Sequence, residues 1–328
     1  MRLMEFHMLD PELVLAASVQ PKYDFSDPLK VRLQIARLSA ALKAQGYWRA
    51  EEQGINCEDV SVAHPDGMAF GVRIYTPTGV GSAAPAIVFF HGGGFMVGDL
   101  DFEHWRCLKW AAGTSSVVLS CDYRLSPEHR YPAAVEDCYA CLLWAADRAT
   151  DIGIDAGRIA VAGSSCGGGL AAATALRARD EGGPPILCQT LIYPVLDDQM
   201  QTTSMLAFID TPGWDSRSSV HMWNHYLPEA RVAGVPPYAA PARASDLSGL
   251  PRTYLMTAEM DPLRDEGLAY GMRLLQAGVP TEIHNFAGAF HAFDAIASSS
   301  LARRALDEQV SFFQRAFHRG PGNSQHRE

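Results

Sequence analysis

The sequence contains no continuous run of about 18 apolar residues, the length that a helix needs to cross a bilayer. Its first residues, MRLMEFHMLDPELV, carry Glu5 and Asp10 and lack the apolar centre of a secretory signal. Neither a membrane span nor an export signal is therefore expected. The predicted location is the cytoplasm.

Positive charge is scarce and scattered along the chain. Lys and Arg number 27 against 37 Asp and Glu, which gives a formal net charge of −10 at pH 7. Proteins that bind nucleic acid gather basic side chains on one face, and the sequence has no such cluster. Nucleic acid is therefore not an expected partner, and the acidic excess favours solubility.

The seven cysteines do not suggest a disulfide framework, because their number is odd and their spacing is irregular. A reducing compartment is the simplest interpretation. Cys138 and Cys141 form a CxxC pair, but they lie in the apolar-periodic segment 133–148, where a free thiol packs as a small hydrophobe. They are predicted to be buried in a helix and not to act in redox chemistry.

The common signatures of metal and cofactor sites are missing as well. His221 and His225 are four residues apart, but no acidic residue lies between them, so they do not match the HExxH pattern of zinc proteases. No G-x-G-x-x-G follows the first predicted strand, which argues against a dinucleotide. The sequence therefore predicts neither a metal nor a bound cofactor.

What the sequence does contain is an alternation of short apolar segments with helical ones. Hydrophobic residues make up 48% of the 328 residues and charged residues 20%, which is typical of a globular protein with a large core. An alternation of this kind predicts an α/β fold, a parallel sheet covered by helices on both faces. Ligands bind such sheets at the carboxyl ends of the strands. The predicted strands are 67–77, 84–90, 115–123, 158–165, 186–194, 252–259 and 280–286, and the predicted helices are 133–148, 168–182, 265–278 and 301–317.

Two segments interrupt this alternation. Residues 1–50 have a helical pattern, clearest over 27–47, and residues 197–240 are too long for an ordinary connection between strand and helix. We expect the two segments to form a helical cap over the strand ends. The catalytic domain would then comprise 51–196 and 241–318, and the polar residues 319–328 would form a frayed tail.

Residues 163–168, GSSCGG, place three candidate nucleophiles between a predicted strand and a predicted helix. Gly163 and Gly167 frame Ser165 in the pattern G-x-S-x-G, in which small residues allow the sharp turn that presents a nucleophile. Cys166 follows the framed position, where the pattern uses the backbone N–H rather than the side chain. Ser164 precedes it and is expected to form a local hydrogen bond. Ser165 is therefore the predicted nucleophile.

The segment HGGG, residues 91–94, directly follows the predicted strand 84–90. Consecutive glycines let backbone N–H groups approach a substrate oxygen, which is the requirement of an oxyanion hole. The predicted donors are the N–H groups of Gly93, Gly94 and Cys166, with Gly92 as an additional candidate.

A nucleophilic serine needs an acid and a histidine, which follow it in that order in folds with this pattern. Asp261 lies just beyond the predicted strand 252–259 and is the preferred acid. Three other carboxylates compete with it, and two of these open the next helix, where acidic side chains favour the N-terminal dipole. The competing residues are Glu259, Asp265 and Glu266.

The preferred histidine is His291, in the loop that follows the predicted strand 280–286 at the carboxyl edge of the sheet. His284 and His318 also come after Asp261 in the chain. His284 lies within that strand and is expected to pack or hydrogen-bond there, and His318 lies in the polar tail.

Five motifs occur in a fixed order over nearly the whole chain: HGGGF, DYRLSPEHRYPAAVED, G-x-S-x-G-G, DPLRDEG and FHAF. In these motifs the sequence resembles the hormone-sensitive lipase-like family of α/β hydrolases, also called bacterial esterase family IV. The resemblance implies an eight-stranded, mostly parallel sheet with a helical cap built from the N-terminal helices and residues 197–240. It also implies that Ser165, Asp261 and His291 form a catalytic triad. The chain departs from the family at Ser164, where Asp or Thr is common, at Cys166, where Ala is common, and at Ala292, where Gly is common.

The function implied is that of a serine carboxylesterase, which hydrolyses small-molecule esters with short to medium acyl chains through an acyl-enzyme. Two alternatives use the same fold: an amidase or deacetylase with the same triad, and a receptor for a small molecule, of the kind that has lost the histidine. Because His291 is present, the sequence favours the enzyme over the receptor. Dimers are common in this family, so a homodimer is a further expectation.

Overall fold

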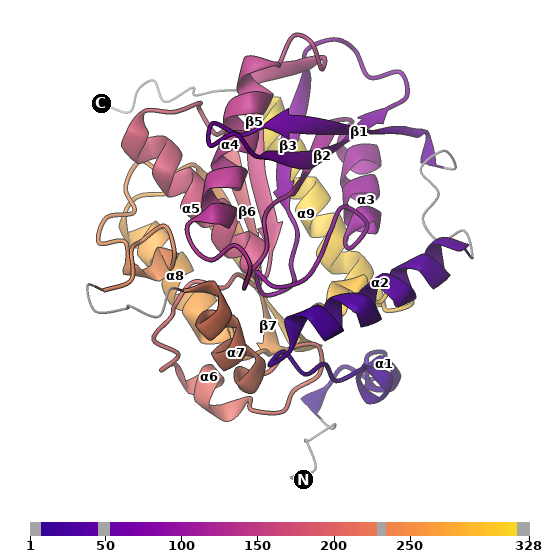
Figure 1. Ribbon diagram of the computed structural model, residues 1–328, viewed down its shortest axis with the longest axis vertical. Coiled ribbons are helices and arrows are strands. Elements are labelled where there is room, and N and C mark those ends of the chain that lie inside the picture. The colour runs from indigo at the N-terminus through magenta and orange to yellow at the C-terminus, as the bar shows by residue number, and fades with distance from the viewer. Residues whose placement is uncertain (1–7, 45–52, 228–233, 320–328) are drawn as a thin grey trace.

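An eight-stranded sheet runs through the centre of the protein in the computed structural model, which describes residues 8–44, 53–227 and 234–319 (Figure 1). The order of its strands is β1-β2-β4-β3-β5-β6-β7-β8. β2 is antiparallel to β1 and β4, and all other neighbours are parallel, which confirms the predicted mostly parallel sheet. The strands are β1 (Ile55–Ala63), β2 (Ala69–Pro77), β3 (Ala84–Phe90), β4 (Val117–Asp122), β5 (Ile154–Ser164), β6 (Cys188–Ile192), β7 (Arg252–Met260) and β8 (Thr281–Phe290).

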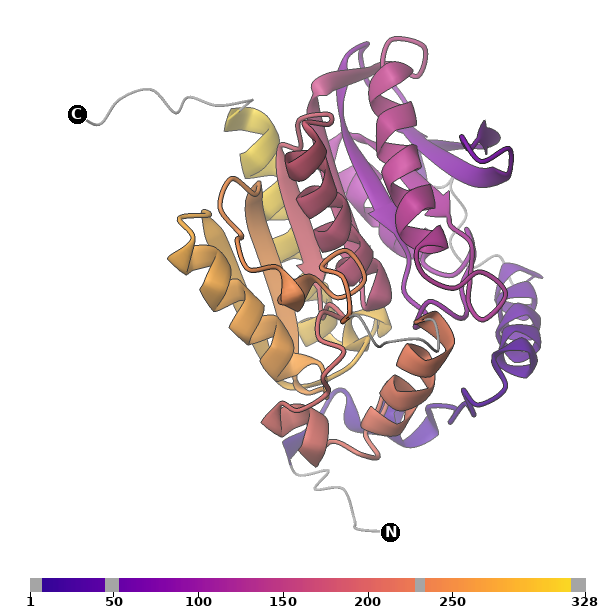
Figure 2. The same ribbon diagram turned by 60° about the vertical axis from the view of Figure 1, so that its left-hand side comes forward.

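The central strands are apolar throughout because both faces of the sheet are covered. In β3, Ile87 and Phe89 belong to one buried cluster, whereas Val88 and Phe90 belong to the other. Helices cover both faces of the sheet (Figure 2), and their side chains contribute to these two clusters. The helices of the first face are α3 (His104–Thr114) and α9 (Ser300–Arg319), and those of the second are α4 (Ala133–Asp147), α5 (Cys166–Glu181) and α8 (Arg264–Gln276).

Four further helices lie at the end of the sheet where the parallel strands finish (Figures 1 and 2). They are α1 (Val14–Val19), α2 (Pro28–Ala44), α6 (Thr203–Ala207) and α7 (Ser216–Tyr226), and they come from the two segments that interrupt the alternation. The rings of Phe25 and Trp214, one from each segment, pack with their centroids 4.9 Å apart. Both side chains belong to the same buried cluster as Val88 and Phe90.

Some elements of the fold differ from the sequence pattern, and some predicted segments lie outside the described residues. The pattern does not predict β1, whose side chains are mostly exposed, nor α3. His318 lies in the last turn of α9 rather than in a tail. Apart from Arg319, the predicted tail of 319–328 lies outside the described residues, as do the ends of the predicted N-terminal segment.

Candidate active site

Ser165 lies at the junction of β5 and α5 with backbone angles of φ 55° and ψ −122°. A non-glycine residue with positive φ is strained, and the close packing of its neighbours keeps the turn in place. A Cβ atom at Gly163 would lie 2.0 Å from the carbonyl oxygen of Gly167, and one at Gly167 would lie 2.0 Å from that of Phe90. The G-x-S-x-G spacing is therefore a steric requirement of this turn.

The structure brings Ser165, Asp261 and His291 together from the carboxyl ends of three strands. Nε2 of His291 lies 3.1 Å from Oγ of Ser165, and Nδ1 of His291 lies 2.6 Å from Oδ2 of Asp261. Asp261 is fully buried, whereas Ser165 and His291 are each 5% exposed. The histidine can thus accept a proton from the serine while the carboxylate holds its other nitrogen.

The competing carboxylates each have a different partner. Oε2 of Glu259 accepts the N–H of Gly288, Asp265 accepts the N–H of Ser204, and Glu266 accepts that of Leu196. The side chains of Asp265 and Glu266 thus bind helix α6 and the segment after β6 rather than capping α8, although both lie in its first turn.

The competing histidines lie elsewhere. His284 lies within β8, where its Nδ1 is 3.0 Å from Glu308 and its ring stacks on Tyr254, as its position in the strand predicts. His318 lies in α9.

The glycine loop that follows β3 faces the same serine. Gly92 and Gly93 line one cavity together with Ser165 and His291, whereas Gly94 and Cys166 lie outside the set of residues that line it. The N–H of Gly92 donates to Oε2 of Glu103 at 2.7 Å. The N–H of Gly92, the additional candidate for an oxyanion donor, therefore already has a partner in this structure.

Ser164 does not form the local hydrogen bond that its position predicts. Its hydroxyl donates to Oε2 of Glu103, which lies 61 residues earlier in the chain. Glu103, Arg106 and Tyr193 also line the cavity, and no sequence motif marks them. Their positions after the glycine loop and at the end of β6 place them at the carboxyl edge, which is the only sequence signal available.

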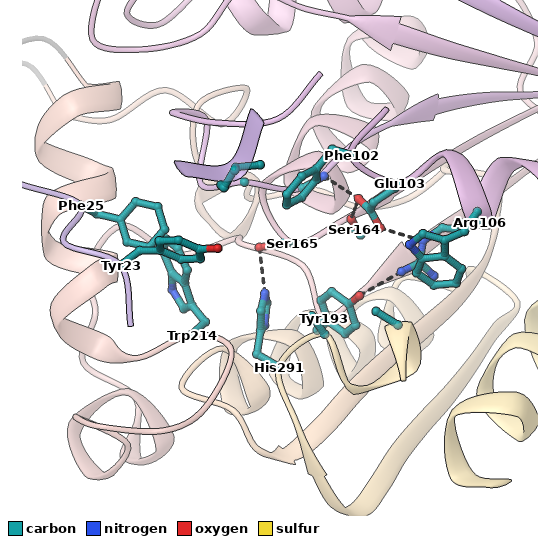
Figure 3. A pocket seen from close by; sticks show the side chains of 16 residues that line it. Tyr23, Phe25, Phe102, Glu103, Arg106, Ser164, Ser165, Tyr193, Trp214 and His291 are labelled. Carbon is teal, nitrogen blue, oxygen red and sulfur yellow. Dashed lines mark hydrogen bonds and ion pairs between the residues drawn. The ribbon is translucent and has the colours of Figure 1, made fainter. Parts of the chain in front are cut away.

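The cavity above Ser165 has a volume of about 160 Å³ and mostly apolar walls (Figure 3). Tyr23, Phe25 and Trp214 form the wall on one side of Ser165, and the hydroxyl of Tyr23 points toward the serine. Trp214 is held by a 2.8 Å hydrogen bond from its Nε1 to Ser219, and its ring centroid lies 6.2 Å from that of His291. The remaining lining residues are Ile35, Phe102, Trp105, Ser164, Ala292 and Ala295.

The side chain of Cys166 is fully buried behind the turn, 3.5 Å from the hydroxyl of Tyr123. Burial raises the pKa of this thiol to about 11. A thiol of that kind is protonated at neutral pH and is a poor nucleophile. Cys138 and Cys141 are free and buried in α4, as the sequence predicts.

Within the described residues, one group of side chains brings potential metal ligands within 4.8 Å of one another: His64, Asp66 and Glu136. The guanidinium of Arg124 pairs with Asp66 at 2.9 Å, so the carboxylate of Asp66 already has a positively charged partner from the protein itself. None of the helices in the same residues combines the length and hydropathy needed to span a bilayer.

Comparison with known proteins agrees with the fold described above. A family model described as the alpha/beta hydrolase fold matches residues 87–295. Esterase LipI of Mycobacterium tuberculosis is 43% identical over 72% of this chain and 74% of its own. Carboxylesterase NlhH of the same organism is 37% identical over 80% of this chain and 84% of its own. A solved structure titled bacterial heroin esterase superposes with a TM-score of 0.91 at 41% identity, over 96% of this chain and 99% of that one.

The chain therefore belongs to the alpha/beta hydrolase family, in the hormone-sensitive lipase-like branch that its motifs resemble. Its activity is the hydrolysis of carboxylic esters, and its substrates are small molecules. The amidase and receptor alternatives are not favoured, because these relatives are esterases.

Proposed function

We propose that Ser165 is the nucleophile of this esterase, His291 its general base and Asp261 the group that orients the histidine. The observation that carries the proposal is the continuous chain of contacts from Asp261 through His291 to Ser165, with distances of 2.6 and 3.1 Å. Oγ of Ser165 attacks the ester carbonyl carbon as Nε2 of His291 takes the hydroxyl proton. Asp261 stabilises the imidazolium that results.

The negative charge on the carbonyl oxygen is stabilised by backbone N–H groups, for which Gly93, Gly94 and Cys166 are the proposed donors. Gly93 lines the cavity beside Ser165, and Cys166 opens α5, where N–H groups lack partners within the helix. His291 then passes its proton to the leaving alcohol, and a water molecule activated by the same histidine releases the acid from Ser165.

The test is the turnover of a p-nitrophenyl ester by Ser165→Ala and His291→Asn. Each should lower kcat by more than about 10⁴-fold, because members of such a triad act as a unit. His284→Asn is the matched control, since this histidine lies in β8, the strand that leads to His291, but contacts Glu308. It should keep kcat within about twofold. Turnover by Ser165→Ala close to that of the parent would overturn the proposal.

The size of the cavity supports short to medium acyl chains. A volume of about 160 Å³ is close to that of a protein cavity that holds one benzene molecule, about 150 Å³. Its walls of Tyr23, Phe25 and Trp214 favour an apolar group. A series of p-nitrophenyl esters from acetate to laurate should give its highest kcat/KM at six carbons or fewer, and a maximum at longer chains would refute this preference.

We further propose that the helices of 1–50 and 197–240 act as a cap over this cavity, within the domain boundaries predicted above. The support is that Tyr23, Phe25 and Ile35 from the first segment and Trp214 from the second line it. The expected homodimer and the cytoplasmic location stay predictions. Light scattering of the purified protein would give its mass in solution.

A further inference from the structure

A buried network of charges lies on the other side of Ser165 from the aromatic wall (Figure 3). Arg106 is at its centre and is 1% exposed. Its Nε donates to Glu103 at 2.8 Å, one terminal nitrogen donates to Asp294 at 2.8 Å, and the other donates to the hydroxyl of Tyr193 at 3.1 Å. The Tyr193 hydroxyl in turn donates to Asp294 at 2.9 Å. Glu103, Asp294 and Tyr193 are also buried.

The network contacts each of the three segments that carry the proposed catalytic groups: the glycine loop, the nucleophile turn and the histidine loop. Oε2 of Glu103 accepts the N–H of Gly92 in the glycine loop and the hydroxyl of Ser164, the residue before the nucleophile. Asp294 lies three residues after His291, and the ring of Tyr193 lies 4.6 Å from that of His291. Helix α3 and the residue that precedes it therefore connect the oxyanion loop, the nucleophile turn and the histidine loop, through Arg106 and Glu103 respectively.

Charge pairing alone does not explain the position of Glu103. Burial by itself would lower the pKa of Arg106, but the carboxylates of Asp294 and Glu103 raise it well above its ordinary value, so the guanidinium stays charged. Pairing with Arg106 requires only Oε1 of Glu103. The second oxygen, Oε2, binds the two loops whose spacing sets the distance between the oxyanion donors and the nucleophile.

We propose that Glu103 is a positioning residue for ester hydrolysis, which fixes the glycine loop against the nucleophile turn while Arg106 and Asp294 hold its carboxylate. The inference rests on the proposed roles of Ser165 and of the backbone donors. Its consequence is that a loosened loop moves the donors away from the developing oxyanion, which affects the transition state more than the bound ester.

Glu103→Gln tests this because it keeps the shape of the side chain. Arg106 needs an acceptor on one side, and the N–H of Gly92 needs one on the other, but an amide offers an oxygen on one side only. One of the two contacts must therefore break. We expect kcat to fall by about 10- to 100-fold, less than the 10²–10³ typical of a lost oxyanion donor, with KM within about threefold.

Glu266→Gln is the matched control. Glu266 is also buried and also accepts backbone N–H groups, from Leu196 and Asp197, but it does not contact the glycine loop. Its amide variant should keep kcat within about twofold. Ser164→Ala is a second variant, which removes only the hydroxyl that donates to Glu103, and it should lower kcat by about three- to tenfold at unchanged KM.

The outcomes separate positioning from stability. A lower thermal midpoint of Glu103→Gln with kcat within twofold of the parent, or a rise in KM alone, would overturn the inference. If Glu103→Gln does not fold, Ser164→Ala provides the test instead. An unchanged kcat in a folded Ser164→Ala variant would also overturn the inference. Full activity of Ser165→Ala would instead refute the proposed function. Inactive Ser165→Ala together with fully active Glu103→Gln would refute this inference alone.

Discussion

Nδ1 of His291 lies 2.6 Å from Oδ2 of Asp261, and the other carboxylate oxygen of Asp261 accepts the N–H of Leu263 at 2.9 Å. Both oxygens of this buried carboxylate are therefore held, and only one of them faces the histidine. An aspartate fixed in this way keeps the proton of neutral His291 on Nδ1 and leaves Nε2 free to accept from Ser165.

Asp261→Asn should therefore lower kcat by about 10⁴-fold with little change in KM, because the amide favours the wrong tautomer of the histidine. Steady-state kinetics on a p-nitrophenyl ester measures this. Asp265→Asn is the matched control, since Asp265 lies four residues further on and binds Arg264 and Ser204. A larger loss in Asp265→Asn than in Asp261→Asn would transfer the role of the acid to Asp265.

The sequence predicts the inner strands and the edge strand β8, but it misses β1, the strand at the other edge. The inner strands are buried on both faces, so each appears as an apolar run between helices. β1 pairs only with β2 and has side chains such as Glu58 and Asp59 exposed, so no apolar run marks it. β1 forms because it can pair with β2, and this pairing cannot be recognised from the residues of β1 alone.

The candidate site divides in the same way. Ser165 lies in a motif whose spacing has a mechanical reason, and Asp261 and His291 follow predicted strands in the expected order, so all three can be located from the sequence. The contact between Ser164 and Glu103 cannot, because it joins residues 61 positions apart and depends on how the glycine loop lies against the turn after β5. Because the sequence shows only the neighbours of Ser164 along the chain, it predicts a local hydrogen bond for this residue instead.

The aromatic wall of the cavity should limit the acyl chain. Trp214→Leu replaces an indole that is 5% exposed and lies beside His291 with a smaller side chain, which frees space in the cavity. We expect the ratio of kcat/KM for the octanoate to that for the butyrate ester to rise by about tenfold or more, since each newly buried CH₂ contributes about 0.8 kcal/mol.

The control for this variant is Leu206→Ala in α6, because Leu206 is 69% exposed and does not line the cavity. It should leave the ratio unchanged. A Trp214→Leu enzyme that folds normally but keeps the ratio of the parent would mean that Trp214 does not limit the acyl chain.

The thiol of Cys166 should resist alkylation in spite of its place beside the nucleophile. It is fully buried, and with a pKa of about 11 fewer than about one in a thousand thiols is ionised at pH 7.5. Iodoacetamide should therefore modify the exposed Cys57 and leave esterase activity unchanged. Treating Cys57→Ser with iodoacetamide for the same time should change neither the mass of the protein nor its activity. Activity loss in step with labelling of the Cys166 peptide would contradict this.

Glu266 should make the stability of the protein depend on pH. Burial raises the pKa of its carboxyl well above the ordinary value, and its Oε2 has no hydrogen-bond partner among the described residues. The folded state therefore binds a proton at pH values where the unfolded state has released it. Above a pH of about 4.5, the free energy of unfolding should fall as pH rises, by at most about 1.4 kcal/mol per pH unit from this group.

Glu266→Gln removes the titration and keeps an oxygen for the N–H groups of Leu196 and Asp197. Relative to the parent, the variant should thus become more stable with each step from pH 5 to pH 8, until the pH passes the raised pKa. Urea unfolding of both proteins at each pH measures the difference, in which all other titrating groups cancel. A difference that stays constant over this range would show that Glu266 is ionised in the folded protein as readily as in the unfolded chain.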